Sequence, residues 1–511
     1  MSNATQPPKT FFERSLDLIE RVGNRVPHPG LLFLSLMVGV IVLSQVLSWM
    51  GISVTYQRIN ADTHELETTT TAVRGLLSTD GIRFIFTSVV PNFINFGPVG
   101  IILVAMIGVG LAERSGLISA LIRSIVQLAP PSAMTWIIVT LGVVSSIATD
   151  AGYLVLIPLG AAAFHSLGRH PLAGLAAAFA AVAATFGVNF LVVPIDGILA
   201  EMTNDAIHMV DLSQSIDIMA NFYFGVASSI LLIIVCAVMT DWIVTPRLGT
   251  YTGDFAAEST QGITDNEKRG LLFTLGALIA IVGLLMLLTI PPGAALRHPE
   301  TGAIIGRSPF MDSLIFLIML VFGGLGIAYG VGARTIRSAE EGIDAITKTL
   351  SDLGGLLFLF FVISQFVAYF NYSNMGTVAA VELANALKDA QLGSVPLLLG
   401  FIGIGFLLCI PIPNIVPKWA IMAPIFVPLF MKLGTAPDVV LAAYRVSDAP
   451  PNVINPLLPY FALVVVFARK YDPTAGVGTI VALMLPYTLA TFIAWVLLFF
   501  GWYLAGLPFG F

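Results

Sequence analysis

Residues 410–424 read IPIPNIVPKWAIMAP and separate two apolar runs, GFIGIGFLLC at 400–409 and IMAPIFVPLF at 421–430. The stretch places Asn414, Lys418 and Trp419 between prolines. Proline removes a backbone donor and clashes with the preceding helical turn. The sequence therefore predicts a helix break with polar side chains inside an otherwise apolar region.

The composition predicts an integral membrane protein. Of the 511 residues, 57% are hydrophobic and 11% are charged, whereas a soluble domain carries about 25% charged residues. Apolar runs of about 20 residues, enough to cross a hydrocarbon core of roughly 30 Å, recur along the chain. Helices must dominate, because lipid offers no partner for backbone polar groups. The fold class we expect is all-α and polytopic, and no basic run suggests nucleic-acid binding.

Nine apolar segments read as full spans, and two do not fit a single crossing. The nine lie near residues 30–50, 97–114, 172–203, 219–243, 270–290, 310–332, 353–385, 438–468 and 476–505. Segment 134–166 is interrupted by SSIATD at 145–150, and segment 395–433 by the opening stretch. Each arm of about 15 residues reaches roughly 22 Å, enough to pass mid-membrane and return. Both segments are therefore predicted to be re-entrant hairpins.

The positive-inside rule supports this count. With the N-terminus in the cytoplasm, the later basic loops fall inside only if both hairpins return to the side that they left. No short apolar core precedes a small-residue cleavage site, so we expect no signal peptide. The predicted organisation has five parts: a cytoplasmic amphipathic N-terminus at 1–29, a first span and outer loop at 30–80, a first half at 81–244, a linking loop and connecting spans at 245–338, and a second half at 339–511.

The two halves have a common pattern of opposite topology. In each half, a hairpin with a polar tip precedes a span that is broken partway, at FGVNFLVVPID (186–196) and at SDAPPNVINP (447–456). Paired interrupted segments of opposite topology indicate an inverted repeat with a binding site near the midplane. The alternative is that Pro and Gly merely kink ordinary spans.

Ionisable residues at bilayer depth are functional candidates, because each costs at least about 2.5–3.5 kcal/mol there. Those within the predicted spans and hairpins are Asp150, Asp196, Lys418, Arg445 and Asp448. Asp150, Asp196 and Asp448 are the candidate ion-coupling carboxylates.

The hairpin tips and breaks also supply uncharged ligands. Ser145 and Ser146 lie at the first tip, and Asn414 takes the equivalent place at the second, where we expect the helix to resume only at Trp419. Open N–H groups at a helix start favour an anion. The amide oxygens suited to a hard monovalent cation belong to Asn189, Asn452 and Asn455. A sodium site is expected at Asn189 and Asn452.

Four residues around the second break allow alternative interpretations. Arg445 and Asp448 stand three apart on one helix face, either as a structural ion pair or with the Arg445 fork free to clamp a carboxylate. Trp419 is either an interfacial anchor or a stacking surface for an aromatic ligand. The long side chain of Lys418 either faces the site or extends into water.

The sequence does not favour an enzyme. The histidines have no metal-ligand spacing, no Gly-Lys-Ser/Thr phosphate loop is present, and Cys236 and Cys409 lie far apart in apolar segments. We expect no cofactor beyond a coupling ion, sodium or a proton. An intramembrane hydrolase acting through Ser145 or Ser146 ranks below a transporter, because no base is placed to activate a serine.

Nine short strings distributed over almost the whole chain form a recognisable set: NRVPHPG (24–30), GLAERSGL (110–117), GRHPLAG (168–174), NFLVVPIDGIL (189–199), TPRLG (245–249), YGVGARTIR (329–337), FNYSNMG (370–376), APIFVPLFM (423–431) and RVSD (445–448). Through these strings the chain resembles the AbgT family of p-aminobenzoyl-glutamate transporters.

The resemblance implies a homodimer in lipid, with nine spans and two opposed hairpins in each subunit and a separate transport path per subunit. It carries the family's functional positions onto Asp196, Trp419, Pro437, Arg445 and Asp448. Family members are described as cation-coupled importers of p-aminobenzoyl-glutamate or as exporters of sulfonamide antimetabolites. We expect a multi-pass protein of the bacterial inner membrane that imports an aromatic dicarboxylate, with proton-driven export as the alternative.

The second hairpin tip departs from the family pattern. The family tip is commonly Ser-rich, whereas this chain has PIPNIVPK at 411–418, with Val416 in place of a serine and an added Lys418. Fewer hydroxyls and one more cation predict a preference for a more acidic substrate.

Overall fold

The computed structural model describes residues 29–59, 66–147, 152–251, 263–304, 308–389 and 393–511. Within these ranges the regular secondary structure is helical except for one antiparallel pair of strands, β1 (Ser53–Ile59) and β2 (Leu66–Ala72), in which Ser53 is paired with Ala72. The all-α prediction is confirmed, and the strands lie in the segment predicted as the outer loop.

The N-terminal part begins with α2 (Pro29–Trp49), which packs against α17 (Gly354–Tyr372). The span predicted at 97–114 coincides with α4 (Gly97–Arg114). A helix that was not predicted, α3 (Thr79–Ile94), precedes it, and the chain between them is extended at Phe96 (φ −76°, ψ 100°). The polar residues of α3 hid its helical character, although the run from Thr79 to Arg114 is long and apolar enough to cross a membrane.

The first predicted hairpin has two helical arms. The first arm is α6 (Met134–Val144), which ends in the 3₁₀ turn η2 (Ser145–Ile147). The second arm consists of η3 (Gly152–Leu156) and α8 (Ile157–Ser166), which packs against α9 (Pro171–Phe179). The interruption at the polar tip therefore lies where the sequence predicted it.

The span after this hairpin is broken as predicted. Helix α9 runs into the π-turn η4 (Ala180–Ala184), and a new helix, α10 (Pro194–Ile207), starts only after a non-helical stretch. Proline is favoured in the first turn of a helix, and Pro194 opens α10.

The second half has the same order of elements. The hairpin arms are α19 (Ser394–Leu408) and α20 (Ile415–Lys432), and the broken span consists of α21 (Pro437–Asp448), η6 (Pro450–Ile454) and α22 (Phe461–Arg469).

One local prediction at the second tip was wrong. The helix resumes at Ile415 instead of Trp419, because Asn414 caps it by accepting a hydrogen bond from the backbone N–H of Val416 at 3.3 Å. Pro417 then lies in the first turn, where its missing donor costs nothing.

The segment 353–385, predicted as one span, is also divided. It forms α17 and α18 (Met375–Asp389), and Asn374 between them has a left-handed backbone (φ +58°). Asparagine tolerates this region better than most residues, which is why the sequence can turn there without a glycine.

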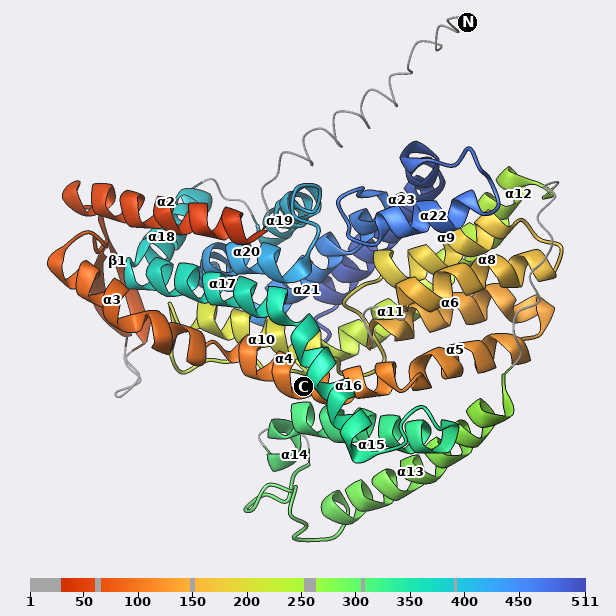
Figure 1. Cartoon of the computed structure of the whole chain (residues 1–511). Coiled ribbons are helices and arrows are strands. Elements are labelled where there is room, and N and C mark those ends of the chain that lie inside the picture. Colours follow the sequence, from red (N-terminus) through yellow and green to blue (C-terminus); the bar gives the residue numbers. More distant parts are fainter. Residues whose placement is uncertain (1–28, 60–65, 148–151, 252–262, 305–307, 390–392) are drawn as a thin grey trace, which may run out of the picture.

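The linking region forms a separate layer. Helix α13 (Asp265–Thr289) packs against α15 (Leu314–Ala333), and α15 packs against α4, below the rest of the molecule in Figure 1. The remaining helices are α5 (Leu117–Leu128), η1 (Pro131–Ala133), α11 (Phe222–Val238), η5 (Met239–Val244), α12 (Thr245–Leu248), α14 (Pro309–Asp312), α16 (Ala339–Asp352) and α23 (Val477–Leu504).

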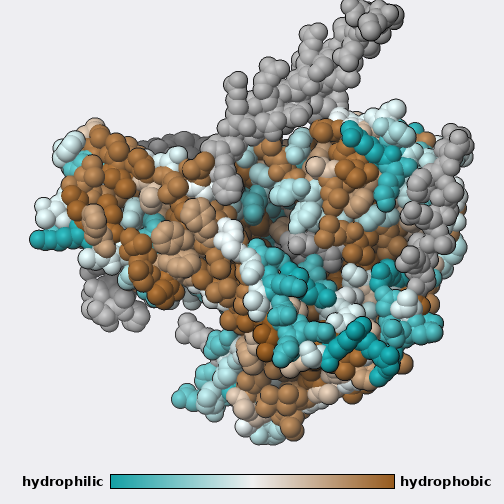
Figure 2. Space-filling model, viewed as in Figure 1, coloured by the Kyte–Doolittle hydropathy of each residue, from teal (hydrophilic) through white to brown (hydrophobic). Residues whose placement is uncertain are grey.

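The surface pattern fits a membrane environment. Within the described ranges, eight helices are long and apolar enough to cross a membrane. Figure 2 shows brown hydrophobic surface over the arm that carries α2 and α3 and over the α13 layer, while hydrophilic residues gather near α16. The eight include α20, which we predicted as a hairpin arm, and the predicted count of nine spans stays a prediction.

The two breaks lie side by side in the interior. The π-turn η4 packs against η6, and α10 packs against both α20 and α21. Polar groups from the two halves therefore meet where helical backbone is interrupted.

Candidate functional site

A buried ion pair joins the first broken helix to the second. Nη1 of Arg445, on α21, lies 2.7 Å from Oδ1 of Asp196, on α10, and the two side chains are 5% and 16% exposed. Asp196 stands in the first turn of α10, where its Oδ2 accepts a hydrogen bond from the backbone N–H of Val193 at 2.8 Å. A carboxylate at this position is stabilised by the positive end of the helix.

Arg445 has a second acceptor in the unwound stretch. The same Nη1 donates to the backbone carbonyl of Gly187 at 2.6 Å, and Gly187 has φ +86°. Glycine enters this region without steric cost, so the bend that presents its carbonyl depends on residue type. Nε of Arg445 has no hydrogen-bond partner among the described residues. One edge of the guanidinium is therefore left for another acceptor.

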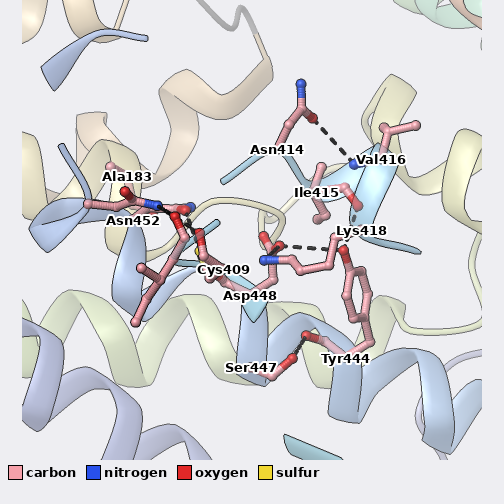
Figure 3. Close-up of polar contacts among 12 residues, drawn as sticks. Ala183, Cys409, Asn414, Ile415, Val416, Lys418, Tyr444, Ser447, Asp448 and Asn452 are labelled. Carbon is pink, nitrogen blue, oxygen red and sulfur yellow. Dashed lines mark hydrogen bonds and ion pairs between the residues drawn. The ribbon is translucent and has the colours of Figure 1, made fainter. Parts of the chain in front are cut away.

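A second buried ion pair lies in the second half. Nζ of Lys418, on α20, lies 2.7 Å from Oδ1 of Asp448, on α21, and the side chains are 0% and 1% exposed. Figure 3 shows Lys418 extending toward Asp448. Each member of the pair predicted within α21 therefore has its partner elsewhere: Arg445 pairs with Asp196, and Asp448 with Lys418. The water-facing interpretation of Lys418 was wrong.

Trp419 is packed between the two halves. It is fully buried, stacks on Tyr444 with ring centroids 4.4 Å apart, and donates through Nε1 to Oγ1 of Thr203 on α10 at 3.1 Å. Tyr444 in turn donates to the backbone carbonyl of Ile415 at 2.5 Å. In this conformation the indole is a structural contact between α20, α21 and α10 and has no exposed face for a ligand.

Asn189 and Asn455 play matching roles in the two halves. The amide of Asn189 donates to the carbonyls of Val143 and Val144 at 3.3 and 3.2 Å, and that of Asn455 donates to the carbonyls of Cys409 and Ile410 at 2.7 and 3.2 Å. In both cases the acceptors lie where the first hairpin arm ends: they are the last two residues of α6 in the first half and the two residues that follow α19 in the second. Each amide oxygen accepts a backbone N–H just after its own residue.

The tip of the first hairpin is tied to Asn189. Nδ2 of Asn189 also donates to Oγ of Ser146 at 2.9 Å, while Ser145 and Ser146 donate to carbonyls of their own helix at 2.7 and 3.0 Å. The oxygen of Asn189 already accepts two backbone hydrogen bonds, so a cation there would have to replace them. Asp150 lies outside the described residues.

Asn452 connects the two breaks directly. Its Nδ2 donates to the carbonyl of Ala183 at 3.3 Å, and its Oδ1 accepts a hydrogen bond from the thiol of Cys409 at 3.2 Å. Asn452, which we expected to be a sodium ligand, therefore lies next to the Lys418–Asp448 pair (Figure 3), and its amide oxygen already accepts a hydrogen bond from within the protein.

Two predicted residues lie apart from the ion pairs. Asn414 is exposed at the start of α20, where it serves as the helix cap. Pro437 is the first residue of α21. At 1.5 Å per residue it lies about 12 Å along the helix from Arg445. Neither residue belongs to the buried polar cluster in this conformation.

A small cavity adjoins the first ion pair, and a much larger cavity lies next to the small one. One of about 20 Å³ is lined by Asp196, Arg445, Asn189 and Asn221 among others, which is room for about one water molecule. The other, of about 790 Å³, is as large as a typical ligand pocket. Both share Ile218, and acidic side chains line the large one: Glu201, Asp217, Asp312 and Asp438.

Burial raises the pKa of Asp217, whose Oδ1 accepts a hydrogen bond from the backbone N–H of Met219 at 2.7 Å. The acidic lining of the large cavity disfavours a polyanion and favours cations.

Sequence analysis did not identify four residues that contribute contacts to the site: Tyr444, Thr203, Gly187 and Cys409. Tyr444 stands four residues before Asp448, so the i, i+4 spacing places both on one helix face and could have identified it. The others act through backbone conformation or contacts between distant segments, which leave no local pattern.

The whole chain matches a known family of membrane proteins. The profile described as "AbgT putative transporter family" matches residues 14–511. This chain belongs to the AbgT family. The p-aminobenzoyl-glutamate transport protein of Escherichia coli (strain K12) is 33% identical over 510 residues, which cover 100% of this chain and 98% of that relative.

Two solved structures share the fold. The YdaH transporter of Alcanivorax borkumensis is 39% identical, with a TM-score of 0.88, and the match covers 95% of this chain and 100% of that one. MtrF of Neisseria gonorrhoeae is 40% identical, with a TM-score of 0.89, and the match covers 96% and 97%. The MtrF structure is described as illuminating a class of antimetabolite efflux pumps. The AbgT chain described here is therefore a multi-pass membrane transporter, and the family gives no support to the hydrolase alternative.

Proposed function

We propose that this AbgT protein is a secondary active transporter of p-aminobenzoyl-glutamate-like aromatic carboxylates, coupled to a proton or sodium ion. The relative from Escherichia coli supplies the substrate class. The observation that carries the proposal is the Asp196–Arg445 pair, which joins the two broken helices in the interior. A substrate carboxylate has the same chemistry as the Asp196 carboxylate that Arg445 already holds.

The coupling follows from carboxylate exchange at Arg445. The unused Nε–H and the planar fork of the guanidinium suit two-point contact with a carboxylate. When a substrate carboxylate takes the guanidinium, Asp196 loses its partner in a nearly water-free site. An unpaired buried carboxylate is costly, so Asp196 then binds a cation. Substrate and cation occupy the site together, and this is the requirement for symport.

The structure corresponds to a state in which this site is closed. The cavity beside Arg445 holds about 20 Å³, far less than an aromatic dicarboxylate needs. Substrate entry thus requires the elements around Arg445 to separate, with α10 and α21 moving relative to each other. Alternating access in transporters built from opposed repeats proceeds by movements of this kind.

The matching roles of Asn189 and Asn455 support the inverted repeat. Each amide ties the break of its own half to the preceding hairpin arm. We place the substrate between the two breaks, with Arg445 as its carboxylate partner, Trp419 released to stack on its ring, and Ser145, Ser146 and Asn414 near the hairpin tips. Asp150 is a further carboxylate that we propose for coupling, whereas Asp448 is already compensated by Lys418.

Export is the alternative direction. Its support is the likeness to MtrF, whose structure is described with antimetabolite efflux pumps. The same exchange at Arg445 would serve export of a sulfonamide-type antimetabolite in return for a proton. For assembly and orientation, we propose a homodimer in the bacterial inner membrane with a cytoplasmic N-terminus.

The test is uptake of labelled p-aminobenzoyl-glutamate by proteoliposomes containing wild-type protein or Asp196→Asn. The variant keeps the shape of the site and lacks the coupling charge. We expect it to exchange labelled for unlabelled substrate but to lose accumulation driven by a cation gradient. Asp80→Asn, which breaks the exposed Arg83–Asp80 pair, is the matched control and should behave as wild type. Gradient-driven accumulation by Asp196→Asn at the wild-type level would refute the proposal.

A further inference from the structure

The second half of the protein contains a fixed positive charge in its interior. The ammonium of Lys418 is fully buried, and its ion-pair partner within the described residues is Asp448. Burying an ammonium costs several kcal/mol unless a nearby opposite charge compensates. Both members lie on helices that border a break, Lys418 at the start of α20 and Asp448 at the end of α21.

The Lys418–Asp448 pair has unused polar capacity. Oδ2 of Asp448 has no hydrogen-bond partner among the described residues, and Nζ of Lys418 has only its ion-pair contact with Oδ1 of Asp448. The thiol of Cys409 donates to the carbonyl of Asp448 at 3.4 Å and to Oδ1 of Asn452 at 3.2 Å. Carboxylate, amide and unwound backbone oxygens are the donor set that holds a hard monovalent cation in broken transporter helices.

The two halves differ in the charge that compensates their carboxylate. The first-half carboxylate, Asp196, is neutralised by Arg445 from the other half. The second-half carboxylate, Asp448, is neutralised within its own half by Lys418. Since Asn189 and Asn455 have the same contacts in the two halves, the difference lies in the charged groups.

We propose that the Lys418 ammonium is a tethered cation that occupies the position of a free sodium ion at the second break. This inference rests on the proposed transport function and specifies its coupling. The ammonium compensates Asp448 without entering or leaving with the substrate. The second half therefore contributes no sodium to the transport cycle, and the coupling cation is bound at the first half, where Asp196 loses its partner.

The test needs no substrate, so it stands apart from the transport assay. The thermal unfolding midpoint of purified protein in detergent is measured in sodium chloride and in choline chloride of equal ionic strength. The proteins are wild type, Lys418→Ser, Lys418→Ser/Asp448→Asn and the control Lys268→Ser, which breaks an exposed pair with Asp265. A ligand that binds only the folded state raises the midpoint with its concentration.

We expect Lys418→Ser to have a lower midpoint than wild type in choline and a sodium-specific upward shift larger than that of wild type. The double variant and Lys268→Ser should show only the wild-type response to sodium. A sodium-specific shift in Lys418→Ser equal to or smaller than that of wild type would overturn the proposal. So would an equally enlarged shift in the double variant, because the sodium would then not be held by Asp448.

If Lys418→Ser is not recovered folded, the uncharged pair Lys418→Met/Asp448→Asn replaces it. Neutral pairs of similar shape often fold as well as the ion pair they replace. Bound sodium is then measured by equilibrium dialysis with radioactive sodium. Wild type and the uncharged pair should bind equal amounts. Loss of one equivalent in the uncharged pair would mean that Asp448 ligates sodium in the wild type and would overturn the proposal.

Discussion

Asp196→Ala and Arg445→Met, made singly and together, should reveal a strong energetic coupling. Removal of one partner leaves the other charge buried, which costs about 3–5 kcal/mol. The lower end of this range applies to each single variant, because the charged group that remains keeps one hydrogen bond. In Asp196→Ala, Arg445 still donates to the carbonyl of Gly187, and in Arg445→Met, Asp196 still accepts from the N–H of Val193. Independent effects would therefore add up to about 6 kcal/mol. The double variant has no buried charge and leaves only two backbone groups unpartnered, at about 1.5 kcal/mol each. We expect a total of about 3 kcal/mol and a coupling energy of about 3 kcal/mol.

The assay is reversible unfolding of the four proteins in mixed detergent micelles, with the free energy of unfolding taken from the transition. The control cycle uses Asp80 and Arg83, whose side chains are 80% and 73% exposed; exposed pairs couple by about 0.2–1 kcal/mol. If the Asp196 and Arg445 effects add to within about 0.5 kcal/mol, the two groups are independent. The pair would then not hold the halves together, and the exchange mechanism would lose its basis.

Variants at three further positions test neighbouring contacts. Trp419→Ala should lower the free energy of unfolding by about 3–5 kcal/mol, whereas Trp419→Phe, which loses mainly the hydrogen bond to Thr203, should lower it by about 1 kcal/mol. Equal losses in the two variants would mean that packing of the aromatic ring does not contribute to stability. Gly187→Ala should lower the free energy of unfolding by about 1–2 kcal/mol, because residue 187 has φ +86°. It should also slow uptake, because the carbonyl that accepts from Arg445 is displaced; unchanged unfolding and uptake would contradict this. Asn455→Ala should cost about 1–3 kcal/mol through the unpartnered carbonyls of the hairpin arm, and wild-type unfolding would refute its capping role.

The sequence located the breaks because their causes are local. Proline, glycine and asparagine within apolar runs disturb the helix where they stand, and the structure interrupts α-helices near 145–147, 185–193, 409–414 and 449–460. The position of charged residues within apolar segments identified Asp196, Arg445 and Asp448, to which the family resemblance added Pro437. The structure places the two carboxylates and the guanidinium in neighbouring ion pairs.

The pairing itself was beyond sequence reasoning. Arg445 and Asp448 have the spacing of a local helical pair, but each lies closer to a group on another helix, Asp196 or Lys418. Which groups meet depends on how α10, α20 and α21 cross, and one sequence does not encode that in any short pattern. The same limit applies to Trp419, whose stacking partner Tyr444 is 25 residues away in the chain, and to the division of 353–385 at Asn374.

The central claim is that a substrate carboxylate replaces Asp196 on Arg445. The most direct test is a structure of the full chain in lipid nanodiscs with saturating p-aminobenzoyl-glutamate. The account predicts one ligand carboxylate within hydrogen-bonding distance of the Arg445 guanidinium and the Asp196 carboxylate displaced from it. A ligand bound elsewhere, with the 2.7 Å contact between Arg445 and Asp196 intact, would contradict it.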